Sequence, residues 1–261
     1  MRHPCSRVPK VISSKAMHWD FALILIFLAA AVPWLGRRRI RLLMQLPETT
    51  KGDRLTLYAS TVAFQWIAAA VVLLRTSAHH ILAFQLGMDI PNAILTAVVS
   101  VLLAALIFAN QINSLRRVVL RPAEAQGMLP QLALKIFPQD TVERLAFFAV
   151  VVTVAACEEL IYRGFVQRVM EDWSGGFVLA GILGSAVLFA LAHLYQGRRG
   201  IFSTLVVGIL FSAIRAWTGS LVPSLVAHFV ADLTAGFLAP SMLRAALRGS
   251  GDALTHSPSA Q

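Results

Sequence analysis

Residues 55–74 and 90–115 contain no Asp, Glu, Lys or Arg side chain. As a helix, each stretch is long enough to cross the roughly 30 Å hydrocarbon core of a bilayer. Further apolar segments lie at 21–35, 145–168, 174–196, 200–215 and 218–240. The sequence therefore predicts an all-α, polytopic transmembrane helical bundle of about seven spans.

The composition excludes the other broad classes of protein. Charged residues make up 14% of the chain and hydrophobic residues 57%, whereas a soluble domain averages about 25% charged residues. Intrinsic disorder requires low hydrophobicity and high charge density. The two cysteines, Cys5 and Cys157, are too few for a disulfide framework or a Cys-x-x-Cys metal site. We expect a multi-pass integral membrane protein in contact with the lipid bilayer, in the inner (plasma) membrane if the source is bacterial.

Basic residues outnumber acidic residues by 23 to 13, which gives a net charge of +10. They cluster between apolar segments, as in cytoplasmic loops, and no soluble domain carries them, which argues against nucleic acid as a partner. The loops 37–54, 116–143 and 198–199 and the C-terminus are predicted to share the cytoplasmic side. This arrangement puts the N-terminus outside, although the four basic residues of segment 1–16 favour the cytoplasmic side. The clusters consist of Arg37, Arg38, Arg39, Arg41, Arg116, Arg117, Arg121, Arg198 and Arg199.

Changes in composition along the chain divide it into five parts. The connection at 116–143 contains three prolines, and its stretch 123–136 is predicted to form a short interfacial helix. The parts are a polar, basic N-terminal segment (1–16), N-terminal transmembrane helices (17–115), a loop (116–143), a C-terminal membrane domain (144–243) and a C-terminal tail (244–261).

Three carboxylates lie well inside apolar segments: Glu158, Glu159 and Asp232. A charge at that depth costs at least about 2.5–3.5 kcal/mol, so each needs a partner or a wet cavity. On a helix, Glu159 and Arg163 share a face at i,i+4 and can form a structural ion pair. Glu158 points about 100° away and has no local cation, which leaves it available as a general base or acid.

Two histidines accompany these carboxylates. His193 follows Phe189 by one helical turn, and His228 shares a helix face with Asp232. Together with Glu158 they can bind and deprotonate a water, directly or through a divalent metal. Taken singly, each feature has a simpler explanation: a hydrogen-bonded core histidine, a structural Glu–Arg pair or a proton pathway. Their occurrence together in the C-terminal membrane domain favours a catalytic site.

The three motifs are Glu-Glu-x-x-x-Arg at 158–163, Phe-x-x-x-His at 189–193 and His-x-x-x-Asp at 228–232. In this order on successive membrane helices, they resemble the CPBP family, which comprises type II CAAX prenyl endopeptidases and bacteriocin-processing or immunity-type (Abi) membrane proteins. The resemblance covers roughly residues 142–240. It implies an intramembrane endopeptidase of the glutamate or metallo type.

The resemblance also implies a role for each site residue. Glu158 would activate water, His193 would bind that water, and His228 with Asp232 would stabilise the oxyanion, although many members have Asn where Asp232 stands. Glu159, Arg163 and Phe189 would support the site. A divalent metal such as zinc, if present, would be held by Glu158, His193 and His228; no other cofactor is implied.

The predicted function is hydrolysis of a peptide bond in a membrane-associated peptide or protein, such as a lipidated protein or a C-terminal anchor. One alternative is a non-catalytic membrane immunity or scaffold protein that keeps the pocket but does not cut. A second is a proton-coupled transporter. It ranks lower because transporters more often carry paired repeats in both halves, whereas all deep carboxylates here lie in the C-terminal half.

Overall fold

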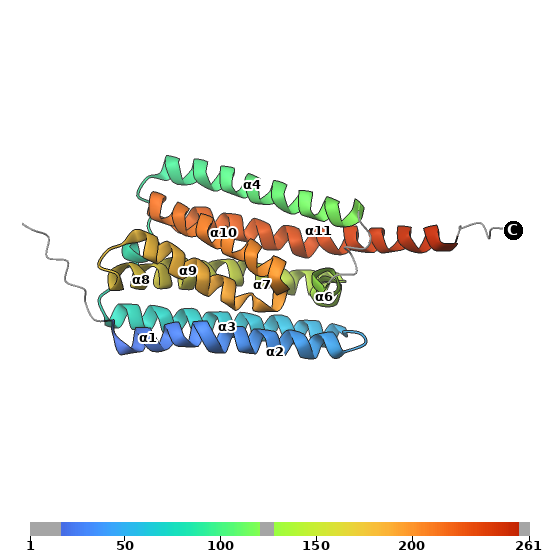
Figure 1. The fold of residues 1–261 in the computed structure, drawn as a ribbon, viewed down its shortest axis with the longest axis horizontal. Coiled ribbons are helices and arrows are strands. Elements are labelled where there is room, and N and C mark those ends of the chain that lie inside the picture. Colours follow the sequence, from blue (N-terminus) through green and yellow to red (C-terminus); the bar gives the residue numbers. More distant parts are fainter. Residues whose placement is uncertain (1–16, 121–127, 256–261) are drawn as a thin grey trace, which may run out of the picture.

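The computed structural model describes residues 17–120 and 128–255, and the regular elements in these residues are helices (Figure 1). The N-terminal segment 1–16, the stretch 121–127 and residues 256–261 lie outside the described residues. In chain order the helices are α1 (Trp19–Ile26), η1 (Phe27–Ala31), α2 (Val32–Gln45), α3 (Lys51–Ala78), η2 (Ala83–Leu86), α4 (Ala93–Leu120), α6 (Met128–Ile136), α7 (Thr141–Glu158), η3 (Glu159–Val166), α8 (Gln167–Trp173), α9 (Val178–Ala192), η4 (Leu194–Gln196), α10 (Gly197–Thr218) and α11 (Val222–Thr255).

Six helical stretches of the described chain are long and apolar enough to cross a membrane. The all-α polytopic bundle predicted from the sequence is thereby confirmed. The seventh predicted span corresponds to α9, which is apolar but has only 15 residues and is about 22 Å long. The six stretches are Trp19–Gln45, Lys51–Ala78, Ala93–Arg117, Thr141–Trp173, Leu194–Thr218 and Val222–Arg244.

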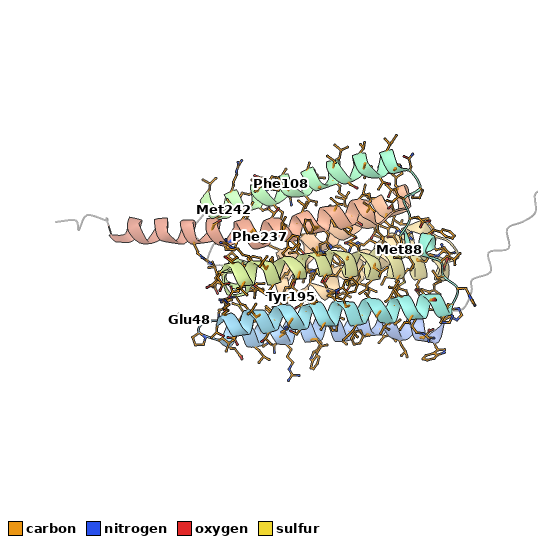
Figure 2. All side chains as sticks on the ribbon, turned by 180° about the vertical axis from the view of Figure 1, so that it is seen from behind. Glu48, Met88, Phe108, Tyr195, Phe237 and Met242 are labelled. Carbon is orange, nitrogen blue, oxygen red and sulfur yellow. The ribbon has the colours of Figure 1, made fainter. Side chains whose placement is uncertain are left out.

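The long helices lie side by side and alternate in direction, so that the connections gather at the two ends of the bundle (Figure 1). Glu48, after α2, and Met88, before α4, lie at opposite ends (Figure 2). The end that holds Glu48 also holds α6 and the end of α11 (Figure 1). We call it the basic end, because α2, α4 and α10 carry their arginine clusters toward it. This is the arrangement that the loop charges predicted.

The outward-facing side chains of the bundle are apolar, as a lipid-facing surface requires. Ile94 and Val101 of α4 are 80% and 68% exposed, and Leu74 of α3 is 69% exposed. Helix α4 packs against α11, and α3 packs against α7. The short helix α6, seen nearly end-on in Figure 1, confirms a helix in the described part of the predicted stretch 123–136.

Helix α7 begins at an N-cap that the sequence specifies. The carboxylate of Asp140 accepts a hydrogen bond of 2.9 Å from the backbone N–H of Glu143, which satisfies one of the free amides of the first turn. The ammonium of Lys51 lies 2.7 Å from Oδ2 of Asp140. The amide hydrogen bond and the lysine together hold the pKa of Asp140 below its usual range. This cap fixes where the helix that carries Glu158 starts.

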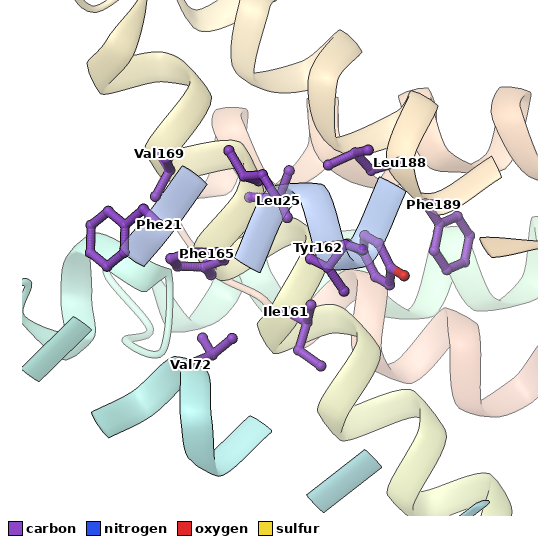
Figure 3. Packing of buried hydrophobic residues seen from close by; sticks show 11 residues of the cluster. Phe21, Leu25, Val72, Ile161, Tyr162, Phe165, Val169, Leu188 and Phe189 are labelled. Atoms are coloured by element: carbon purple, nitrogen blue, oxygen red, sulfur yellow. The ribbon is translucent and has the colours of Figure 1, made fainter. Parts of the chain in front are cut away.

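The helix of α7 and α8 is interrupted by η3, a π-helical segment directly after Glu158. All eight residues of η3 are buried. Phe165 and Ile161 pack with Phe21 and Leu25 of α1 and Leu188 of α9 (Figure 3). Such π-helical insertions occur frequently at functional sites, and here the insertion is buried along its whole length.

Candidate functional site

A cavity of about 820 Å³ opens between the N-terminal helices and the C-terminal membrane domain. Glu158, His193 and Asp232 line it together with the aromatic ring of Tyr162. Apolar side chains of η1, α2, α3, α6 and α7 form much of the remaining wall, including Leu28, Val32, Phe64, Leu132 and Val150. Three of the residues predicted for the site therefore share one apolar chamber.

Glu158 has one oxygen held and one oxygen free. Its Oε1 accepts a hydrogen bond of 2.7 Å from the side-chain amide of Gln65 on α3. Its Oε2 is buried and has no hydrogen-bond partner in the described structure, and it lies 3.9 Å from Nε2 of His228. The arrangement orients the carboxylate and leaves Oε2 as the oxygen that can accept a proton.

Glu159 is paired with two partners through the same oxygen. Its Oε1 lies 3.0 Å from Nη1 of Arg163, as the i,i+4 spacing predicted. The same oxygen lies 2.8 Å from Nδ1 of His228 on α11. Because a carboxylate oxygen accepts, Nδ1 donates to it. The pair that looked purely structural in the sequence therefore also sets the orientation of His228.

The other nitrogen of His228 faces the remaining acids of the site. Nε2 of His228 is 3.6 Å from Oδ2 of Asp232, one turn later on α11, and 3.9 Å from Oε2 of Glu158. Both separations are longer than a hydrogen bond. Nε2 therefore faces both carboxylates without a direct hydrogen bond to either.

Phe189 connects the charged network to His193. The guanidinium carbon of Arg163 lies 4.0 Å from the centroid of the Phe189 ring, within the range of a cation–π contact. The same ring lies 4.6 Å from the imidazole of His193. Nδ1 of His193 is 2.8 Å from the carbonyl oxygen of Phe189, and since a carbonyl only accepts, Nδ1 donates and Nε2 is left as an acceptor. Because α9 has only 15 residues, His193 at its C-terminal end lies inside the bundle and not at the end of the bundle.

The donor set implied for a metal does not converge in the structure. Within residues 17–120 and 128–255, no group of three or more His, Cys, Asp or Glu side chains is placed to hold a metal ion. One nitrogen of His228 already donates to Glu159, and one oxygen of Glu158 is occupied by Gln65. As arranged here, Glu158, His193 and His228 do not fit a shared metal site.

All seven residues predicted for the site lie in one connected network of α7, η3, α9 and α11. Sequence reasoning missed Gln65, which contributes to the site from the N-terminal half. The only signal was a single side-chain amide in the uncharged stretch 55–74. It also missed the contact between Glu159 and His228, because the two residues lie on different helices.

Comparison with known proteins gives one family. The family model of the Rce1-like type II CAAX prenyl endopeptidases matches residues 141–234. No curated protein and no solved structure matches the chain. The matched residues run from the start of α7 into α11 and include Glu158, His193, His228 and Asp232. Residues 141–234 of this chain are therefore similar to the Rce1-like type II CAAX prenyl endopeptidases.

Proposed function

We propose that this protein hydrolyses a peptide bond of a membrane-associated peptide or protein, with Glu158 as the general base. The observation that carries the proposal is the asymmetric environment of Glu158. Gln65 holds one oxygen, while the other is unpaired and lies 3.9 Å from Nε2 of His228, at a cavity that His193 also lines and that is large enough for a peptide. A base must be oriented and must also have an oxygen free for the proton it takes.

In the proposed reaction, water binds between Oε2 of Glu158 and Nε2 of His193, which accepts one of its hydrogen bonds. The water oxygen attacks the scissile carbonyl carbon, and its proton passes to Glu158. The carbonyl oxygen becomes an oxyanion, which Nε2–H of His228 stabilises in the protonated imidazolium form, while Nδ1–H still donates to Glu159. Glu158 then transfers its proton to the leaving nitrogen, and the C–N bond breaks to give a carboxylic acid and an amine.

Asp232 serves a different role from the amide that many family members carry. An ionised carboxylate would repel an oxyanion, so Asp232 is a poor donor to it. Its position 3.6 Å from Nε2 of His228 suits it to orient that imidazole.

The class of substrate follows from the cavity, whose largely apolar wall fits a peptide with a lipid or other hydrophobic group attached.

The proposal is tested with the full chain in lipid nanodiscs and a farnesylated peptide that carries three aliphatic residues after the modified cysteine. We expect Glu158→Gln to lower cleavage by about 10²–10⁴-fold, with His193→Ala and His228→Ala similarly impaired. The matched control is Glu171→Gln, which removes an acid from the same continuous helix away from the cavity. Mass spectrometry identifies the products.

Cleavage by Glu158→Gln at the wild-type rate would overturn the proposed role of Glu158. Binding of the peptide by the wild type without any cleavage would instead support an immunity or scaffold function. Proton-coupled flux in proteoliposomes without cleavage would support a transporter.

A further inference from the structure

A chain of buried hydroxyl groups joins α9 and α10 to the π-helical turn of η3. Oγ of Ser185 on α9 donates a hydrogen bond of 2.7 Å to the carbonyl oxygen of Tyr162 in η3. Oγ of Ser212 on α10 lies 3.2 Å from Oγ of Ser185. Because Ser185 gives its single proton to the carbonyl, Ser212 donates to Ser185. Both serines are completely buried.

The carbonyl of Tyr162 lies at the wide part of the turn. In an α-helix it would accept the backbone N–H of Val166, four residues later. Here it accepts the backbone N–H of Gln167, five residues later, which is the π-helical pattern. Its other lone pair accepts the hydroxyl of Ser185. Helix α9 therefore stabilises this carbonyl in its π-helical position.

The side chain of Gln167 closes the network. Its Nε2 donates a hydrogen bond of 3.0 Å to the backbone carbonyl oxygen of Ser212, and the whole side chain is buried. Helix α8, which begins at Gln167, is thereby joined to α10, and α10 to α9 and η3. A buried donor or acceptor that loses its partner here has no bulk water to replace it.

The width of the turn affects how Glu158 is oriented relative to the rest of the site. Glu158 lies directly before the turn and is held from α3 by Gln65. Tyr162 lies within the turn and packs against Phe189 of α9, with ring centroids 5.2 Å apart (Figure 3). A turn that takes up one extra residue changes the relative rotation of the helices on its two sides by about 100°. A return to the α-helical pattern would therefore rotate Glu158 relative to Tyr162 and Phe189.

We propose that Ser185 and Ser212 are positioning residues, which hold the π-helical turn in the register that points Glu158 into the cavity. The inference rests on the proposed function, since it assumes that Glu158 is the general base. Ser185 acts through the carbonyl of Tyr162, and Ser212 acts through Ser185. Neither serine is among the residues that line the cavity.

Infrared spectroscopy tests the contact to the turn in the full chain in nanodiscs, labelled with tyrosine that carries ¹³C at its carbonyl carbon. The chain has three tyrosines, so Tyr58→Phe and Tyr195→Phe assign the band of the Tyr162 carbonyl. We expect Ser185→Ala to move this band to higher wavenumber, because the carbonyl loses a hydrogen bond. Ser212→Ala should move it less, since Ser185 still donates.

Cleavage of the farnesylated peptide by the same variants tests the positioning role. We expect Ser185→Ala to lower kcat by about 10–100-fold with KM unchanged, because the base is misplaced while the cavity stays intact. Ser212→Ala should lower kcat by about 2–10-fold. Adding Ser212→Ala to Ser185→Ala should have little further effect, since the two residues act in series.

The control is Ser100→Ala on α4. It also removes a buried hydroxyl, which donates at 2.6 Å to the carbonyl oxygen of Thr96 in the same helix, away from the cavity wall. This variant should keep the wild-type kcat, whatever its melting temperature.

An unchanged Tyr162 band in Ser185→Ala overturns the proposal. A shifted band with the wild-type kcat also overturns it, as does an equal fall of kcat in Ser100→Ala, because the hydroxyls would then serve packing alone. If the wild type cleaves no peptide, the proposed function fails, whereas the band shift still supports the part of the inference that assigns the turn to these serines.

Discussion

The side-chain amide of Gln65 donates a 2.7 Å hydrogen bond to Oε1 of Glu158. The donor comes from α3 in the N-terminal half, whereas the acceptor lies in the family-matched region. The neighbouring Trp66 donates from Nε1 to Oγ1 of Thr153 at 3.2 Å on the same helix as Glu158. Helix α3 is therefore a part of the candidate site and not only a membrane anchor.

Replacement of Gln65 tests this positioning role. We expect Gln65→Leu to lower kcat by about 10–100-fold, because one hydrogen bond to a charged group is lost, while KM for the farnesylated peptide stays unchanged. The control is Trp66→Phe, which removes the neighbouring hydrogen bond to α7 but does not touch Glu158. A matching fall in both variants, or a change confined to KM, would show that Gln65 acts through general packing.

The buried pair of Glu159 and Arg163 should affect both stability and activity. Both side chains are fully buried, so Arg163→Met leaves the Glu159 carboxylate with only His228 as a charged partner and is expected to cost about 3–5 kcal/mol. The exposed pair of Arg168 and Asp172 has the same i,i+4 spacing on the same continuous helix, and Arg168→Met should cost at most about 1 kcal/mol. Denaturation in mild detergent compares the two variants. Equal costs would mean that burial does not set the strength of the pair.

A second buried pair joins the N-terminal helices to the matched region. Nη2 and Nε of Arg54 lie 2.8 Å and 3.0 Å from the two oxygens of Glu143, and both side chains are buried. We expect Arg54→Met to destabilise the protein by about 3–5 kcal/mol, since it leaves a buried carboxylate without its cation.

The matched control for that pair is Lys51→Met, because Lys51 pairs with Asp140 between the same two helices but both side chains are about half exposed. It should leave the melting temperature nearly unchanged. If Lys51→Met lowers the melting temperature as much as Arg54→Met, the buried pair has no special role in joining the two parts.

Metal removal tests a mechanism that relies on protein groups and water. We expect protein treated with EDTA, and shown by elemental analysis to be free of zinc, to cleave within about twofold of the untreated rate, since no metal-activated water is used. Magnesium-treated and untreated samples serve as controls. Loss of cleavage that is restored by stoichiometric zinc would contradict the expectation and would require Glu158, His193 and His228 to move together.

The sequence by itself determined the membrane class, the connections that share one end of the bundle and most residues of the candidate site. Apolar length predicts transmembrane helices regardless of what packs on them, and the arginine clusters predict which connections share an end. The 100° turn between Glu158 and Glu159 separates an unpaired acid from a paired one, because that angle is a local property of a helix. Spacing within single helices likewise put Phe189 beside His193 and His228 beside Asp232.

Only the tertiary structure decided which helices meet. The contacts from Gln65 to Glu158 and from Glu159 to His228 span 93 and 69 positions in the sequence, and no local period records such pairings. The π-helical turn of η3 was also hidden, since it depends on packing against α1, α3 and α9 rather than on residue propensity. In the sequence, Gln65 is one uncharged polar residue of a spanning segment and Arg39 is one of a cluster of arginines. Packing of α3 onto α7, and of α2 onto α9 and η4, gives them their places in the cavity wall.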